Sequence, residues 1–331
     1  MKRNWHDIEN LILSEYACKS ADTKGRQYKE TKKDLRTDFQ RDRDRIIHSK
    51  AFRRLKYKTQ VFITPEGDHY RTRLTHALEV SQIARTVARG LALNEDLTEA
   101  IALGHDLGHT PFGHAGEIAL NQVHPGGFRH NEQSLRIVDL LEGGKGLNLT
   151  WEVRDGILHH TGPGIPETLE GQIVKTADRI AYINHDIDDA LRGRVLHPGE
   201  LPKPCLDVLG HTHSERIGRM VTDMIDSSYD QQKIIMSEEI SQAMLELRKF
   251  MFDHVYIASI AKKEETKAKM IVAEVYRFFM ENPSLLQNEY QSPVECIDHS
   301  QEVCDFVSGM TDRYIISLYK KMVIPEPWLI I

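Results

Sequence analysis

The stretch GHDLGHTPFGHAGE (residues 104–117) carries an unusual density of ionisable side chains. Its fourteen residues include three histidines, two acids and four glycines. Imidazole and carboxylate groups at this density are costly to bury in a core unless they are paired or hold a ligand. An apolar helical pattern runs up to Leu103, and Gly108 and Pro111 then end it. We therefore expect a helix end that presents polar groups to a site.

On both sides of this stretch, nearly every periodic segment is helical. A stripe of apolar residues at 3.6-residue spacing covers about 73–91, and Asn94 or Asp96 can cap the helix that follows. Further helices are expected from about residue 115 and at about 131–141, 150–160, 168–193, 214–227, 237–252 and 264–280. The best strand candidate is YKTQVFI at 57–63. The predicted fold class is all-α, with room for one small β-ribbon near residues 56–70.

The domain organisation predicted for residues 1–331 is one all-α unit. The Pro- and Gly-rich stretch at 197–204 is the one boundary candidate, and we interpret it as a loop within that unit. We expect a catalytic core at about 41–195 and a C-terminal helical region at about 196–331.

Composition indicates an ordinary soluble protein. Of 331 residues, 40% are hydrophobic and 28% charged. There is no apolar run of membrane-spanning length and no signal-peptide pattern, which predicts a cytoplasmic protein that does not bind membranes. The four cysteines are scattered, which favours free thiols over disulfides or a zinc ribbon. Seventeen histidines, many near acids, favour metal chemistry.

Charge is unevenly distributed along the chain. The net charge is −6, yet basic residues dominate between Lys24 and Lys58. A basic block in an acidic protein suggests a phosphate-rich partner. A solvated helix face with neighbouring acids explains the block equally well, so both interpretations stay open.

Four residues on three separate predicted helices form a candidate metal site. His105 and Asp106 lie at a helix end, His76 near the start of an earlier helix, and Asp178 on the long helix at 168–193. Two imidazoles and two carboxylates suit a divalent cation, with Mn, Mg, Fe, Co, Ni and Zn all candidates. Each residue alone is explained by capping or a salt bridge, so the prediction rests on the set.

The order His76, His105-Asp106, Asp178 resembles the H…HD…D signature of HD-domain metal-dependent phosphohydrolases. The segments RTRLTHALEV, HDLGHTPFGHAGE, RHNEQS and DRIAYINHDIDDA resemble the deoxynucleoside triphosphate triphosphohydrolases, the dGTPase-like branch. RDRDRIIHSKAFRRLKYKTQVF and SGMTDRYIISLY resemble the same branch, so the resemblance spans about residues 41–319. It implies a helical HD fold and a hydrolase that splits a dNTP into deoxynucleoside and tripolyphosphate by water attack at the α-phosphorus.

The resemblance also implies catalytic residues. His114 and Glu117 are three apart and can share a helix face, where a carboxylate orients an imidazole. By resemblance, the family's catalytic positions fall on His109, His114, Glu117 and His130. We expect His114 to transfer protons and Glu117 to tune it, while His109 is equally well explained as a phosphate contact. Which group acts as acid and which as base stays open.

The resemblance further implies residues that bind the substrate. Asp178, Tyr182 and Asp186 are spaced i, i+4, i+8, so they follow one face of a helix. By resemblance, Tyr182 closes over the deoxyribose and Asp186 accepts from its 3′ hydroxyl. The remaining candidates are polar or basic residues and one apolar residue expected beneath the base: Arg53, Gln60, Val61, Arg73 and Arg179.

Several questions stay open at the level of sequence. His159 and His160 either touch phosphates or a second metal, or form a hydrogen-bonded pair at a helix end. The expected partners are a dNTP substrate and further copies in a hexamer or tetramer, while the basic block also allows a dNTP effector or single-stranded nucleic acid. The alternatives are an HD phosphohydrolase for another nucleotide, a nuclease, or a regulatory protein with a vestigial site. Base preference, with dGTP as one candidate, is not encoded in a readable pattern.

Overall fold

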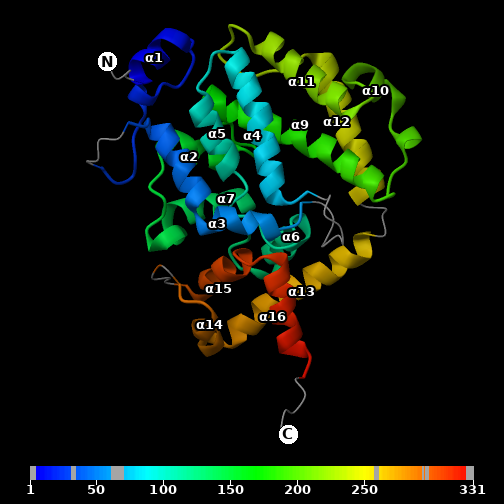
Figure 1. The fold of residues 1–331 in the computed structure, drawn as a ribbon. Coiled ribbons are helices and arrows are strands. Elements are labelled where there is room, and N and C mark those ends of the chain that lie inside the picture. Colours follow the sequence, from blue (N-terminus) through cyan, green and yellow to red (C-terminus); the bar gives the residue numbers. More distant parts are fainter. Residues whose placement is uncertain are drawn as a thin grey trace.

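The computed structural model describes residues 5–30, 35–60, 71–256, 261–292, 294 and 298–325. All regular elements in these ranges are helices, and Figure 1 shows them in two stacked groups. The α-helices are α1 (Trp5–Ile12), α2 (Asp38–His48), α3 (Lys50–Arg54), α4 (Arg73–Gly90), α5 (Glu95–Gly104), α6 (His114–Val123), α7 (His130–Arg136), α8 (Trp151–His159), α9 (Leu169–Arg192), α10 (Lys203–Leu209), α11 (His213–Ser228), α12 (Glu238–Met251), α13 (Ala261–Glu281), α14 (Pro283–Glu289), α15 (His299–Ser308) and α16 (Asp312–Val323).

The all-α prediction is confirmed. Residues 61–70, where most of the predicted β-ribbon would fall, lie outside the described residues. The residues on either side of this gap are joined by an isolated antiparallel bridge between Thr59 and Thr72. None of the described helices is long and apolar enough to cross a membrane.

The helices that carry the site begin at side-chain caps. Thr72 and Thr75 form a reciprocal capping box at the start of α4. Asn94 accepts from two backbone N–H groups at the start of α5, which confirms one of the two caps that the sequence allowed. Thr168 caps α9 by accepting from Gly171. Caps of this kind satisfy amide groups that would otherwise lack partners, and they fix where each helix starts.

One hydrophobic core is centred on α4, α5 and α9. Its largest fully buried side chains include Ile83, Leu97, Ile101 and Leu103. Gly156 on α8 allows close packing there, because a Cβ atom at this position would lie 2.6 Å from the Cδ1 atom of Ile101. Helices α10–α12 add their apolar faces to the same core. This core holds the three helices that bear the predicted metal ligands.

A second hydrophobic core lies at the other end of the molecule, where α13–α16 gather (Figure 1). It combines residues of these helices, such as Val272 and Val307, with Phe112, Leu120 and Phe128. The turn before α6 and α6 itself therefore pack with the C-terminal helices, although the sequence grouped them with the catalytic core. Conversely, α10–α12 belong to the first core. Packing thus divides the chain differently from the predicted division near residue 195.

Candidate metal centre and catalytic site

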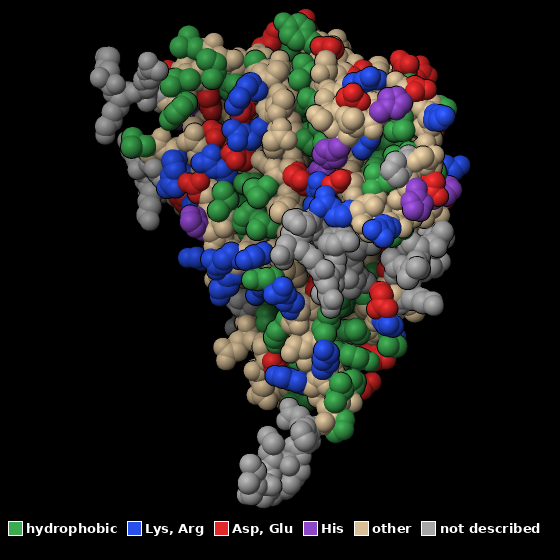
Figure 2. All heavy atoms as spheres, turned by 45° about the vertical axis from the view of Figure 1, so that its right-hand side comes forward, with side chains coloured by type: hydrophobic (Ala, Val, Ile, Leu, Met, Phe, Trp, Pro, Cys, Tyr) green, Lys and Arg blue, Asp and Glu red, His purple; other side chains and the backbone are tan. Residues whose placement is uncertain are grey.

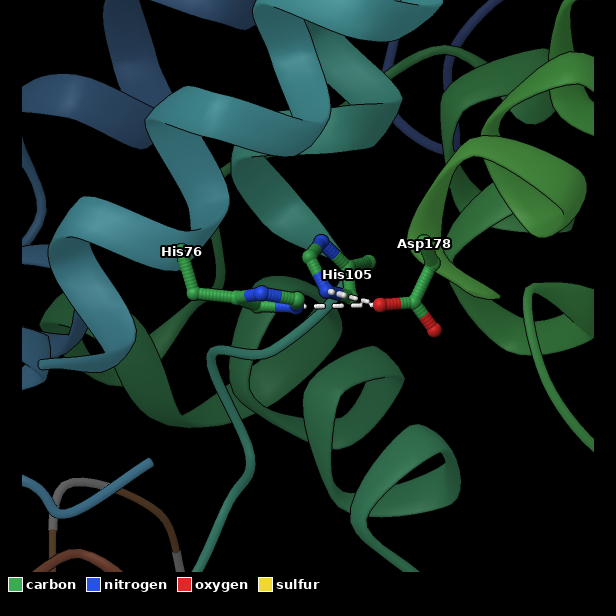
Figure 3. A group of neighbouring side chains, drawn as sticks. All are labelled: His76, His105 and Asp178. Atoms are coloured by element: carbon green, nitrogen blue, oxygen red, sulfur yellow. Dashed lines mark hydrogen bonds and ion pairs between the residues drawn. The ribbon is translucent and has the colours of Figure 1, made fainter. Parts of the chain in front are cut away.

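Three of the four predicted metal ligands converge. His76 comes from the first turn of α4, His105 from the end of α5 and Asp178 from the middle of α9 (Figure 3). The Oδ1 atom of Asp178 lies 3.0 Å from Nε2 of His76 and 3.7 Å from Nε2 of His105. Both histidines are buried and Asp178 is half-buried. Side chains far apart in sequence are thus brought to one point between three helices.

The protonation of His105 suits a metal ligand. Its Nδ1 atom lies 2.6 Å from the carbonyl oxygen of Ala102, so Nδ1–H donates there and Nε2 keeps its lone pair. That Nε2 atom is buried and has no hydrogen-bond partner among the described residues. A buried, oriented lone pair beside a carboxylate is costly unless something fills the space between them. The donor set of two imidazoles and a carboxylate therefore fits a divalent cation.

Asp106 lies beside the group formed by His76, His105 and Asp178, but it also forms an ion pair with Arg73. Its Oδ1 atom lies 3.5 Å from Nε2 of His105, and its Oδ2 atom accepts from Arg73 at 2.7 Å. Although burial opposes ionisation, the Arg73 guanidinium beside this carboxylate holds the pKa of Asp106 well below its usual value. Asp106 is therefore an ionised carboxylate with one oxygen toward the triad, and its role as a fourth ligand stays a prediction.

A second group of possible ligands is formed by Asp106, His109 and His130. The rings of His109 and His130 are stacked, with centroids 4.3 Å apart and planes at 17°. Lone pairs lie in the ring plane, so two stacked imidazoles direct theirs into separate, nearly parallel planes, which disfavours convergence on one ion. Arg73 already neutralises Asp106. This group suits an anion such as a phosphate better than a second cation.

Glu117 holds His130 in a defined state. One carboxylate oxygen accepts from the backbone N–H and from Nδ1 of His130, both at 2.9 Å. The Nε2 atom of His130 lies 3.1 Å from Nε2 of His160, whose Nδ1–H donates to the carbonyl of Ile157. The Nε2 atom of His160 must then accept, and the Nε2–H group of His130 must donate. His130 therefore carries a proton on each of its two ring nitrogens. Burial opposes this charge, but Glu117 outweighs it and raises the pKa of His130.

His114 occupies a different position from the other histidines. It is the first residue of α6, its side chain is 79% exposed, and its Nδ1 atom lies 3.8 Å from Glu117. The expected pairing of His114 with Glu117 is therefore a loose approach, and the close partner of Glu117 is His130. An exposed imidazole at the edge of the site can still exchange protons with water.

The predicted sugar-binding residues lie further along α9. Asp186 is fully buried and Tyr182 half-buried, and burial raises the pKa of each well above its usual value. Gln60 is 9% exposed, and its carbonyl oxygen Oε1 has no hydrogen-bond partner among the described residues. Val61, expected beneath the base, lies outside the described residues.

The predicted arginines separate into three environments. Arg73 is buried against Asp106, as described above. Arg179 follows Asp178 on α9 and is exposed. Arg53 on α3 is exposed, and among the described residues its guanidinium has one hydrogen bond, at 3.4 Å to the carbonyl oxygen of His48. Figure 2 shows Lys and Arg side chains gathered at the left of the view, at mid-height. The exposed Lys50, Arg53, Arg54 and Lys56 have no acidic ion-pair partner among the described residues.

Two buried histidines were missing from the predicted site. His160 contacts His130, and its ring centroid is 5.0 Å from that of His105. Burial lowers the pKa of His160 to about 3. His185 lies one turn beyond Ala181 on α9, with its ring 6.0 Å from that of His76. The pair His159-His160 after a predicted helix was the one available signal for the first, whereas nothing in the sequence marked His185.

Comparison with known proteins agrees with this geometry. Residues 73–183 match the HD domain, and residues 234–321 match the phosphohydrolase-associated domain. A deoxyguanosinetriphosphate triphosphohydrolase-like protein of Caldanaerobacter subterraneus is 58% identical over 97% of this chain and 95% of that protein. A protein of the same description from Clostridium tetani is 49% identical over 98% of this chain and 97% of that protein.

Solved structures share the fold at lower identity. A phosphohydrolase from Bacteroides thetaiotaomicron has a TM-score of 0.54 at 18% identity, covering 85% of this chain and 68% of that one. A hypothetical protein from Aquifex aeolicus has a TM-score of 0.52 at 20% identity, with the same coverage of both chains.

Fold and site together define an HD-domain phosphohydrolase, and the chain is a hydrolase. Within that class, it belongs to the family of deoxyguanosinetriphosphate triphosphohydrolase-like proteins.

Proposed function

We propose that this chain is a metal-dependent dNTP triphosphohydrolase that releases a deoxynucleoside and tripolyphosphate. The observation that carries the proposal is the convergence of His76, His105 and Asp178 on one buried point, with Tyr182 and Asp186 one and two turns further along the helix of Asp178. One helix then serves both the reacting phosphate and the sugar. The names of the relatives make dGTP the first substrate to test.

In this proposal the divalent cation is held by His76, His105 and Asp178, with Asp106 as the expected fourth ligand. When bound, it polarises the α-phosphate and offsets the negative charge that develops during attack by water. The metal requirement is supported by the buried lone pair of His105 that the described residues leave without a partner.

The remaining groups act on charge and protons. Arg73 and the His130 imidazolium provide fixed positive charge beside His109, where the phosphates are expected. Glu117 keeps His130 charged, and His114 at the exposed edge exchanges a proton with the water or with the 5′ oxygen. Arg179 and Arg53 are proposed to attract the triphosphate from solvent.

The part of the site further along α9 is proposed to select a deoxyribose. Tyr182 packs over the 2′ carbon, and Asp186 and Gln60 bind the 3′ hydroxyl, with Val61 beneath the base. The buried Gln60 amide supports this, because its carbonyl oxygen has no hydrogen-bond partner among the described residues and a hydroxyl can supply one.

The association and location of the chain are part of the proposal. We expect a cytoplasmic homo-oligomer, a hexamer or tetramer. The exposed basic residues of α3, which lack acidic partners in the described part of the chain, could take a dNTP effector or single-stranded nucleic acid. The apolar segment VIPEPWLII (323–331) suits burial either at an interface or on the chain's own core, and its residues 326–331 lie outside the described residues.

Product analysis tests the reaction. The purified chain is incubated with each dNTP and Mn²⁺ or Mg²⁺, and the products are separated by chromatography. Tripolyphosphate and deoxynucleoside are expected. Nucleoside monophosphate with pyrophosphate, or degradation of short single-stranded DNA without dNTP turnover, would favour another nucleotide hydrolase or a nuclease.

A further inference from the structure

The segment SGMTDRYIISLY (308–319) spans the end of α15 and the start of α16, and none of its residues belongs to the proposed site. Within it, Asp312 is 4% exposed, although aspartate is almost never fully buried unless it is paired. The helix start does not need this carboxylate, because Thr311 already caps α16 by accepting from the backbone N–H of Tyr314 at 3.3 Å. The carboxylate of Asp312 is therefore engaged elsewhere.

Asp312 binds two segments that lie far away in the sequence. Its Oδ1 atom accepts from the backbone N–H of Phe112 at 2.9 Å. Its Oδ2 atom accepts from the backbone N–H of Thr59 at 3.0 Å and also from the hydroxyl of Thr59. Loss of a buried acceptor would leave these donors without partners, which costs more than the bonds contribute in water.

Lys58 ties together the same three segments. Its side chain is 2% exposed, and its ammonium donates to the carbonyl oxygen of His109 and, at 2.9 Å, to that of Ser308. The carbonyl oxygen of Lys58 in turn accepts from the backbone N–H of Arg73 at 3.2 Å. Two buried charged side chains thus join residues 58–60, 109–113 and 308–312.

The turn held in this way has an unfavourable backbone. Phe112 has a φ of +60°, a left-handed conformation that bulky residues rarely adopt, and Gly113 follows with a φ of +57°. A Cβ atom on Gly113 would lie 2.9 Å from Nη2 of Arg73 and 3.2 Å from the carbonyl oxygen of Thr59. Such a turn persists only where its surroundings fix it. His114 is the next residue, so the direction of the turn sets the position of that imidazole.

We propose that Asp312 is a positioning residue that holds the 109–113 turn, and with it His109 and His114, against the segment that carries Gln60. The C-terminal helices are then part of the catalytic apparatus without contributing a group that touches substrate. The catalytic consequence rests on the proposed function, whereas the restraint on the turn does not.

Hydrogen exchange on the full-length, Mn²⁺-loaded chain tests the restraint directly. In Asp312→Asn, the side-chain amide places a donor against the N–H of Thr59 or Phe112, so the clamp is broken with almost no change in volume. Peptides covering 107–114 should exchange at least about tenfold faster, because the turn opens locally, while peptides from α9 should be unchanged.

Kinetics separate positioning from mere stabilisation. For Asp312→Asn we expect kcat per bound Mn²⁺ to fall about 100-fold, because small displacements of catalytic groups lower the rate by about this factor. The number of Mn²⁺ ions bound per chain should be unchanged. A purely stabilising role would lower Tm and leave kcat of the folded, metal-loaded chain intact. Thr59→Val removes one of the three bonds and should give a smaller fall in kcat and a smaller rise in exchange.

Asp298→Asn is the matched control. Asp298 caps α15 in the same region by accepting from the backbone N–H of Ser300 at 3.0 Å, and it makes no bond to the turn. It should leave both kcat and exchange at 107–114 unchanged.

If peptides covering 107–114 exchange at the wild-type rate in both Asp312→Asn and Thr59→Val, the proposal is overturned. If Asp312→Asn does not fold, Thr59→Val decides alone. If the wild-type chain hydrolyses no dNTP, the proposed function fails, and the exchange experiment still decides whether the restraint exists.

Discussion

Two neighbouring clusters use nearly the same residue types for different purposes. In the first, His76, His105 and Asp178 direct their atoms toward one point. In the second, the rings of His109 and His130 are stacked beside an aspartate that an arginine already neutralises. Residue type alone does not decide which cluster binds a cation. The difference arises from where each ring is anchored, since His105 is fixed by a backbone carbonyl and His130 by a carboxylate.

The largest expected effect comes from breaking the first cluster. His105→Ala removes an oriented nitrogen ligand, so bound metal should fall below detection and dNTP hydrolysis should drop by at least about 1000-fold. Elemental analysis after gel filtration and steady-state kinetics measure the two quantities. His211→Ala, which alters an exposed histidine on the protein surface, is the control. Retention of metal and activity in His105→Ala would show that the metal assignment is wrong.

The second cluster should respond in activity alone. His130→Ala removes the imidazolium held by Glu117, and kcat should fall about 100- to 1000-fold, the usual range for a group that handles charge or protons. Metal content should stay at the wild-type level. If His130→Ala instead loses metal in proportion to activity, the two clusters form one ligand set and the distinction drawn between them fails.

A buried carboxylate outside the site behaves differently. Asp106 is kept ionised by the neighbouring Arg73, whereas Glu170 accepts from the backbone N–H groups of Cys18 and Asn94. Burial raises the pKa of Glu170 from 4.5 to about 7. The folded state therefore holds its proton more tightly than the unfolded chain. This destabilises the fold progressively between pH 4.5 and about 7, and by a constant amount above that.

Glu170→Gln should remove this loss of stability. Its amide oxygen can still accept from both backbone groups, so the free energy of unfolding at pH 8 should exceed that of wild type by about 3 kcal/mol. The gain should shrink toward zero near pH 4. Urea unfolding at several pH values measures it, and Glu167→Gln, an exposed neighbour, should change little. An equal difference at pH 4 and pH 8 would contradict the assigned ionisation.

The smallest effect tests the sugar end of α9. Tyr182→Ala opens the space expected beside the 2′ carbon, so selectivity for dNTP over rNTP, taken as the ratio of kcat/KM values, should fall about tenfold. The metal end of the same helix should keep its Mn²⁺. Selectivity that stays at the wild-type value would argue against Tyr182 as the group that excludes a 2′ hydroxyl.

Helical periodicity and caps made most of the fold predictable. The stripe at 73–91 and the long segment at 168–193 correspond closely to α4 and α9, because an apolar face and a capped start are local properties. The packing of α6 with α13–α16 was not predictable in this way. It depends on contacts such as that between Asp312 and Phe112, which are 200 residues apart.

The sequence predicted which residues belong to the site better than it predicted which of them contact each other. The sequence pattern indicated His76, His105 and Asp178, and the structure brings them together. The sequence pattern linked Glu117 to His114 because these residues are three apart. The close partner of Glu117 is instead His130, which is thirteen residues away and across a turn. His160 entered only as half of an ambiguous pair, since no local rule says that the end of α8 meets α7.

Isotope labelling tests whether water attacks the α-phosphorus at the first cluster. The Mn²⁺-loaded chain is given dGTP in H₂¹⁸O, and the products are separated and their masses measured by mass spectrometry. We expect one ¹⁸O atom in tripolyphosphate, none in deoxyguanosine, and no turnover with His105→Ala. Label in deoxyguanosine, or release of labelled dGMP with unlabelled pyrophosphate, would contradict it.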